Sequence, residues 1–260
     1  MKIKTIRFSA ATAIGTRATN QDFFYVPHFL TEKNNAHEQV VPFTEITADA
    51  LHVFAVCDGI ASLRNSDEAA YEALLSVKES VAQQPQISFT DTEALEIWVH
   101  DTLLKAQNNM IKYCQNNNID GSCTIVLLAI YEDNFVLANI GDSAAFLWKN
   151  EEVTELSYRH NVAQFKRMMG LEPSTEEEKL LLMHLGSDAV QQDIQFNVYC
   201  GTLEEGDTFL LCSDGVSANA AIDIKTVFEK ETTAQELAHL ASSQPNADNC
   251  TAIIINVCAS

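Results

Sequence analysis

Short apolar runs recur along the 260-residue chain, and several are closed by an aspartate and a small residue. Residues 3–12 alternate between apolar and polar positions, with the period of a half-buried strand. The run VFAVC at 53–57 is continuously apolar and ends at Asp-Gly, a pattern typical of a strand buried on both faces. The strands predicted in this way are 3–12, 23–26, 53–57, 122–130, 134–140, 144–148, 193–200, 208–213 and 250–257.

Helical periodicity lies between these groups of strands. From Thr92 to Asn116, apolar residues recur about every 3.6 positions, as they do on the buried face of a helix. A shorter helix extends from Ser66, which we expect to cap it, to about Gln83. Further helices are predicted over 158–187, 223–230 and 233–243.

One segment follows neither period. Residues 27–51 are mostly polar and include two prolines, so we expect a long connection or insertion at the surface. Elsewhere strands and helices come in blocks instead of alternating, and no linker rich in Gly, Pro or Ser divides the chain. This organisation favours a single α+β domain over residues 1–260.

Composition excludes several classes of partner. The chain has 36 acidic and 16 basic residues, a formal net charge of −20. Surfaces that bind nucleic acid or anionic lipid need clustered Lys and Arg, which this chain lacks. No stretch approaches the roughly 18 apolar residues of a spanning helix, and the N-terminus does not have the pattern of a secretion signal. We therefore expect no nucleic-acid and no membrane partner.

The cysteines and histidines suggest neither disulfides nor a metal site of their own. The seven cysteines are odd in number and include no Cys-x-x-Cys pair, which favours a reducing, cytoplasmic compartment. The seven histidines include no His-Glu-x-x-His motif. Metal chemistry, where it exists in this chain, must come from other ligands.

Five aspartates stand at strand ends or in tight turns, most of them beside a glycine or a small polar residue. A single Asp-Gly is ordinary turn chemistry, but five after apolar strands indicate a shared rim. Carboxylate oxygens from several strands suit hard cations such as Mg²⁺ or Mn²⁺. Two such ions can activate a water for displacement at phosphorus. The five residues are Asp22, Asp58, Asp142, Asp214 and Asp248.

The segments around these aspartates resemble, in order, those of a known family, the metal-dependent serine/threonine protein phosphatases of the PP2C (PPM) type, in particular its bacterial members. The matching segments are Gly15-x-Arg17-x-x-Asn20-Gln21-Asp22, VFAVCDG (53–59), GSCT (121–124), ANIGDSAAFL (138–147), LLCSDGV (210–216) and DNCT (248–251). The resemblance implies a β-sandwich of two mainly antiparallel sheets flanked by helices. It also implies a flap region over residues 160–192.

The resemblance further implies a ligand set for two core ions, Mn²⁺ or Mg²⁺. Asp58 corresponds to the carboxylate that bridges the two ions, and Gly59 to the residue that adds its backbone carbonyl. Asp214 and Asp248 correspond to the remaining ligands of the first ion. Asp22 corresponds to the acid that holds waters beside the second ion.

Four more residues are interpreted beside the same resemblance. Asp142 corresponds to a ligand of a third, weaker ion, shared with Asp214. Arg17 corresponds to the arginine that binds the substrate phosphate, which suits a planar guanidinium on a chain poor in cations. Its alternative is a surface salt bridge. Asn249 is expected to orient Asp248, and His160 to serve structure or solvent contact instead of proton donation.

The sequence also departs from the family pattern. Ile60-Ala61-Ser62 replaces the usual Met-Gly-Gly or His-Gly-Gly, and Ala144 replaces the usual arginine after Gly-Asp-Ser. Neither change removes a core ligand.

The function that the resemblance implies is hydrolysis of phosphoserine and phosphothreonine by direct attack of a metal-bridging water. The implied partners are phosphorylated proteins and a cognate Ser/Thr kinase, with the enzyme acting as a monomer. Two alternatives stay open: a catalytically weak or inactive regulatory binding module, motivated by residues 60–62, and a phosphatase of small phosphate esters.

Overall fold

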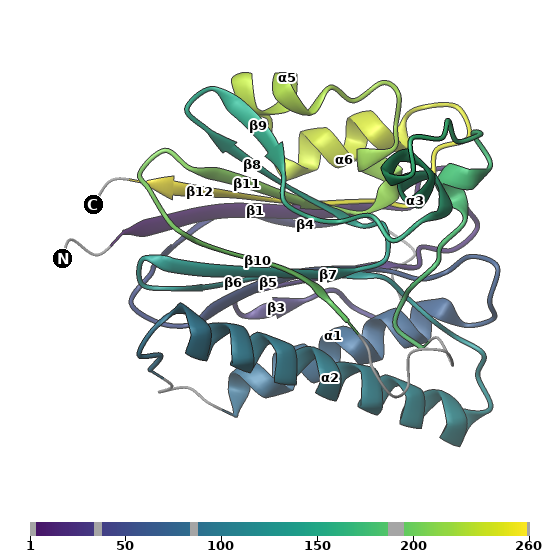
Figure 1. Cartoon of the computed structure of the whole chain (residues 1–260), viewed down its shortest axis with the longest axis horizontal. Helices are drawn as coiled ribbons and strands as arrows, with labels where there is room; N and C mark the ends of the chain where they lie inside the picture. The colour runs from purple at the N-terminus through teal and green to yellow at the C-terminus, as the bar shows by residue number, and fades with distance from the viewer. Residues whose placement is uncertain (1–3, 34–37, 84–87, 187–194, 259–260) are drawn as a thin grey trace.

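The computed structural model describes residues 4–33, 38–83, 88–186 and 195–258. Two six-stranded sheets lie face to face, with helices on the outer face of each (Figure 1). Every strand pairing among the described residues is antiparallel. This architecture confirms the expected α+β sandwich.

The first sheet is built around the two ends of the described chain. Its order is β4-β1-β12-β11-β8-β9. Strand β1 pairs with β12 without a break, from Thr5 opposite Cys258 to Ala13 opposite Cys250. The strands are β4 (Gln39–Thr47), β1 (Thr5–Ala13), β12 (Cys250–Cys258), β11 (Thr208–Cys212), β8 (Ala144–Lys149) and β9 (Glu152–Glu155).

The second sheet is formed mainly by the middle of the chain, in the order β10-β7-β6-β5-β2-β3. Its central strands β5 and β6 are apolar and almost wholly buried, as expected for strands covered on both faces. The strands are β10 (Asn197–Thr202), β7 (Asn134–Ile140), β6 (Ile125–Tyr131), β5 (His52–Asp58), β2 (Asp22–Val26) and β3 (Phe29–Leu30).

The core lies in three layers. Between the sheets, alternate residues of both sheets interdigitate, as in the edge-to-face pair of Phe8 and Phe54, whose ring centroids are 5.2 Å apart. Outside the second sheet, α1 (Ser66–Ala82) and α2 (Thr92–Asn117) bury their apolar stripes. Outside the first sheet lie α4 (Asp214–Ser217), α5 (Ile224–Glu229) and α6 (Ala234–Ser242). None of the helices described is long and apolar enough to cross a bilayer.

Two sequence expectations need correction. Within the segment 27–51, Gln39–Thr47 is not an irregular insertion but β4, an edge strand whose outer positions are exposed. Of the helices expected over 158–187, the described residues 158–186 form only α3 (Val162–Met168) and a short 3₁₀ turn, η1 (Glu177–Lys179). Polar edge strands and charged, loosely packed segments carry little periodicity, because neither buries a regular face.

Smaller differences concern the ends of elements. Asn65, in the left-handed region, precedes α1 in place of the expected Ser66 cap. The strand expected over 193–200 is described from Asn197 onward, and its first two residues lie outside the described part of the chain. Strand β9 and helix α4 were not expected.

Candidate metal centre

The sheet register brings the first two aspartates together. Asp22 begins β2 and Asp58 ends β5, and the two residues are directly opposite each other in the antiparallel pair. The backbone continues this contact, since the Gly59 N–H donates to the Gln21 carbonyl over 3.1 Å. The backbone hydrogen bonds between β2 and β5 therefore hold the two carboxylates side by side.

The other three aspartates come from turns at the same end of the sandwich. Asp142 follows β7, Asp214 follows β11, and Asp248 precedes β12. Asp58, Asp142, Asp214 and Asp248 line a single cavity of about 260 Å³, together with Gly59 and Arg17. Asp22 does not line this cavity. It lies fully buried behind it and accepts a hydrogen bond from Ser213 Oγ at 2.6 Å.

Burial and mutual repulsion dominate the electrostatics of the cluster. Burial, opposed by hydrogen bonds from Ser213 and Thr251, raises the pKa of Asp22 to about 7. Burial, with the neighbouring charge of Asp214, raises the pKa of Asp142 to about 7 as well. The pKa of Asp58 rises well above its usual range through burial and then through the surrounding carboxylates.

Asp58 is the centre of this arrangement. Asp22 and Asp214 each lie within hydrogen-bonding reach of its carboxyl group. Asp142 and Asp248 also raise its pKa through their charges. A buried carboxylate surrounded by four others needs positive charge to stay ionised.

The donor set fits divalent cations, although the side chains as they stand do not form a closed ligand shell. Among the described residues, no group of three or more His, Cys, Asp or Glu is arranged as a complete metal site. The carboxylate of Asp248 is paired with the Arg17 guanidinium. The fit therefore rests on chemistry: clustered oxygen donors, high negative charge and a water-accessible cavity, which hard cations such as Mn²⁺ and Mg²⁺ require.

Arg17 thus makes a salt bridge, but with a residue of the centre itself. Its pairing uses a single described hydrogen bond, from Nη2 to Asp248. A guanidinium has five N–H donors, so others stay available to an anion in the cavity that Arg17 lines. The salt-bridge and phosphate-binding interpretations of Arg17 are compatible.

Asn249 acts differently from the expectation. Its backbone N–H donates to Asp248 Oδ1 at 2.9 Å, so it does orient that carboxylate, but through the main chain. Its side-chain amide donates to the carbonyls of Ile14 and Thr19 at 2.9 and 3.0 Å, and its Oδ1 accepts from the Gln21 N–H at 2.9 Å. The side chain therefore fastens the loop that carries Arg17 to the start of β12.

Two glycines permit this close approach. A Cβ on Gly15, whose φ is +63°, would lie 2.1 Å from the Asp248 carbonyl oxygen. A Cβ on Gly215 would lie 1.9 Å from the Asn249 carbonyl oxygen. Backbone occupies both positions, so no side-chain movement could relieve either clash.

Several residues of the site were not singled out from the sequence. Thr124 Oγ1 accepts from the Asp58 N–H at 3.2 Å and bonds to Ser143 Oγ at 2.6 Å, which links the turns of Asp58 and Asp142. Their position inside the GSCT and GDS segments was the available signal. Lys179, in η1, lines the cavity as a second cation, and nothing in its sequence context marks it.

His160 has the expected structural role. Its ring is buried, its Nδ1 lies 3.2 Å from the Gly141 carbonyl oxygen, and burial lowers its pKa. It is not among the residues lining the cavity of the aspartates. His160 therefore supports the turn that presents Asp142.

The family model of protein phosphatase 2C matches residues 42–254. The chain belongs to the protein phosphatase 2C family. Asp58, Asp142, Asp214 and Asp248 fall inside the matched range, whereas Arg17 and Asp22 precede it. The departures at 60–62 and 144 therefore lie within a recognisable member of the family.

Named relatives agree with this assignment. The serine/threonine phosphatase stp of Listeria innocua is 24% identical over 220 residues, which cover 80% of this chain and 85% of the relative. A putative protein phosphatase of Mycoplasma pneumoniae is 25% identical over 260 residues, covering 92% and 98% of the two chains.

Solved structures share the phosphatase 2C fold. The catalytic domain of the phosphatase PstP, in complex with two manganese ions, superposes with a TM-score of 0.72 at 20% identity, covering 98% of this chain and 100% of that one. The serine/threonine phosphatase of S. agalactiae gives a TM-score of 0.74 at 22% identity, covering 97% of this chain and 99% of that one. At these identities the likeness establishes the fold alone.

The glycine contacts predict a selective loss of stability. Gly15→Ala and Gly170→Ala both place alanine at positive φ, but only Gly15 has backbone in the way of the new Cβ. In urea unfolding, we expect Gly170→Ala to cost about 1 kcal/mol and Gly15→Ala at least about 2 kcal/mol more. Equal losses in the two variants would contradict the contact between the Arg17 loop and Asp248.

The charge cluster predicts that removing a candidate ligand stabilises the fold in chelator. Since the raised pKa of Asp58 opposes folding once pH exceeds its unfolded value, Asp58→Asn should raise the free energy of unfolding at neutral pH by on the order of 1 kcal/mol. Asparagine keeps the shape and donates to the neighbouring carboxylates.

Added Mn²⁺ should reverse that order. Saturation at about 100 times the dissociation constant stabilises a folded protein by about 2.7 kcal/mol, and the variant should lose most of this gain. The matched control is Asp101→Asn, whose side chain is 74% exposed on α2. Stabilisation of both variants by Mn²⁺ to the same extent would exclude Asp58 as a ligand.

Proposed function

We propose that this chain hydrolyses phosphoserine and phosphothreonine in proteins and depends on Mn²⁺ or Mg²⁺. The observation that carries the proposal is the gathering of five aspartates and Arg17 at one end of a phosphatase 2C sandwich. Relatives named serine/threonine phosphatases, and a PstP structure holding two manganese ions, support the substrate class and the metal.

The aspartates divide the work of holding the ions. The Asp58 carboxylate would be shared by two core ions, the Gly59 backbone carbonyl would add a further ligand, and Asp214 and Asp248 would complete the first ion. Asp22 would hold water beside the second, and Asp142 would contribute with Asp214 to a third. When bound, the ions supply a water of lowered pKa and neutralise charge on the phosphoryl group.

The residues of the chain itself position the substrate. Arg17 presents its unused N–H donors to the cavity, where a planar fork matches phosphate oxygens. Its pairing with Asp248 and the Asn249 side chain keep the guanidinium at the cavity rim. Binding the phosphate there orients the phosphorus for in-line attack and leaves the protein chain of the substrate outside the cavity.

The remaining parts of the proposal concern context. Phosphorylated proteins are the expected partners, with a cognate Ser/Thr kinase opposing the reaction and a monomer as the working state. A single domain over residues 1–260, with a flap over 160–192, belongs to the proposal as well. All seven cysteines are free thiols, which supports a reducing, cytoplasmic setting.

Activity should depend on the candidate ligands. In a phosphothreonine-peptide assay with added Mn²⁺, we expect Asp58→Asn and Asp214→Asn to lower kcat at least about 100-fold, because each removes oxygen donors and charge from the centre. Asp101→Asn, on the exposed face of α2, should match the unaltered protein.

Chelator should abolish the activity, and Mn²⁺ should restore it. Full activity in chelator would overturn the proposal. Mn²⁺ binding by calorimetry without turnover would favour the regulatory binding module. Faster hydrolysis of sugar phosphates than of phosphopeptides would favour the phosphatase of small esters.

The two interpretations of Arg17 separate in kinetics. If Arg17 binds phosphate, Arg17→Met should lower kcat/KM about 10- to 100-fold, the effect of a charge-assisted hydrogen bond, and leave the Mn²⁺ concentration for half-maximal activity unchanged. A shift of that Mn²⁺ midpoint with KM unaltered would show that Arg17 serves only to hold Asp248. Arg64→Met, at an exposed arginine, is the control.

A further inference from the structure

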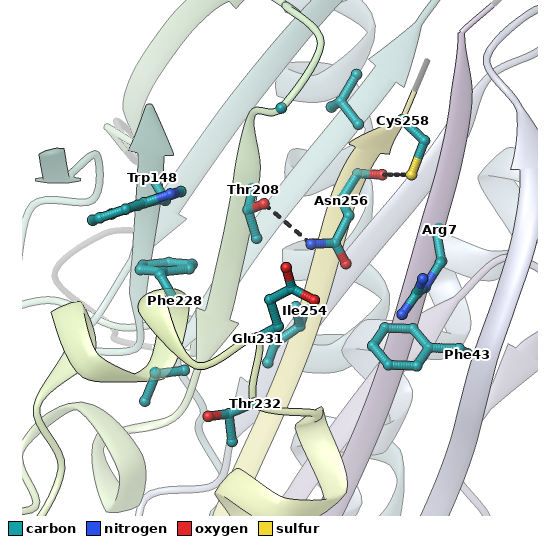
Figure 2. Close-up of a pocket in the computed structure, with 13 residues that line it drawn as sticks. Arg7, Phe43, Trp148, Thr208, Phe228, Glu231, Thr232, Ile254, Asn256 and Cys258 are labelled. Carbon is teal, nitrogen blue, oxygen red and sulfur yellow. Dashed lines mark hydrogen bonds between the residues drawn. The ribbon is translucent and has the colours of Figure 1, made fainter. Parts of the chain in front are cut away.

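A second cavity lies at the opposite end of the first sheet from the aspartates. It has a volume of about 310 Å³, near the lower limit for small-molecule sites. Strands β1, β11 and β12 and the connection between α5 and α6 contribute to its walls (Figure 2). None of the candidate metal ligands lines it.

The cavity lies beyond the N-terminus of α6, where the helix no longer covers the sheet. The first residue of the helix, Ala234, donates its N–H to Ser9 Oγ on β1 over 3.2 Å. Arg7 precedes Ser9 by two residues and so extends from the same face of the strand. Its side chain therefore lies beyond the helix, in the space that the helix leaves uncovered (Figure 2).

Arg7 is a half-buried cation that makes no ion pair among the described residues, although Glu45 stands opposite it on β4. Its guanidinium lies 4.0 Å from the centre of the Phe43 ring, a cation–π contact. Its Nε is buried and has no hydrogen-bond partner in the described part of the chain. Acidic residues outnumber basic ones in this chain, 36 to 16, yet none forms an ion pair with Arg7 among the described residues. The guanidinium can therefore bind an external anion.

Aromatic rings form the opposite wall. Trp148 and Phe228 stack with centroids 5.8 Å apart and planes 19° from parallel (Figure 2). Asn256 is uncharged, and its side-chain amide donates to Thr208 Oγ1 at 3.1 Å. Glu231 also lines the cavity and makes no ion pair with Arg7, so an anionic group is favoured only at the Arg7 side.

We propose that this cavity binds a small aromatic carboxylate, with the carboxylate on Arg7 and the ring against Trp148 and Phe228. The bidentate fork of arginine matches a carboxylate, and stacked rings accept a planar apolar body. The proposal is independent of the phosphatase activity, since none of the proposed metal ligands takes part.

The test uses the two tryptophans of the full chain as reporters. The probes are 2-naphthoate and its neutral counterpart 2-naphthamide, titrated into ¹⁵N-labelled protein. Trp98 lies on α2, packed against the second sheet, and Trp98→Phe assigns its indole N–H signal by removing it. We expect 2-naphthoate to shift the Trp148 signal saturably and to leave that of Trp98 in place.

Charge recognition decides the class of ligand. We expect 2-naphthoate to bind about tenfold or more tightly than 2-naphthamide, and Arg7→Met to remove that difference. Arg64→Met, outside the cavity, should keep it. Two results on the unaltered protein would overturn the proposal: a Trp148 signal that does not move at millimolar 2-naphthoate, or equal affinities for the two probes. Both can be obtained even if Arg7→Met fails to fold. Retained preference for 2-naphthoate in folded Arg7→Met would overturn it as well.

Discussion

The repulsion among buried carboxylates is the constraint on which this structure depends. Asp22 and Asp58 face each other across a strand pair, and Asp214, Asp142 and Asp248 add their charges from neighbouring turns. Such a cluster persists only where the surrounding fold is stable enough to impose it. The strands that carry the aspartates are apolar and buried, and the free energy gained by burying them offsets the repulsion among the carboxylates. Divalent cations would relieve the same repulsion, which makes ion binding and folding stability two consequences of one arrangement.

The sheets explain why the cluster has a defined geometry. A one-residue slip of β2 against β5 would turn Asp22 to the other face of the sheet and place its apolar neighbours in its stead. The turns are fixed in a different way, by backbone contacts too close for any side chain, as at Gly15 and Gly215. The scarcity of glycine in the chain is informative for this reason, because the few present include those at which backbone meets backbone.

The sequence predicted the parts of the fold that bury a regular face. The buried strands and the two long helices have clear hydrophobic patterns, because their apolar side chains are buried at the intervals that each type of element sets. Strand β4 and the segment around α3 were not predicted correctly, since exposed residues can be polar without regular spacing. The aspartates could be predicted as a group from their places at the ends of strands or in the turns beside them, and from the family resemblance. The pairing of Arg17 with Asp248, the clamp made by the Asn249 side chain and the approach of Lys179 could not, because each joins residues far apart in the chain through side-chain geometry alone.

The two cavities share strands but not a mechanism for communication. Strands β1, β11 and β12 line the Arg7 cavity at one end and lead to Arg17, Asp214 and Asp248 at the other. Coupling between such sites requires an element with two alternative arrangements. The nine-residue ladder between β1 and β12 is unbroken, and sliding it would reverse every buried face. A ligand at Arg7 therefore has no route through these strands to alter the metal centre.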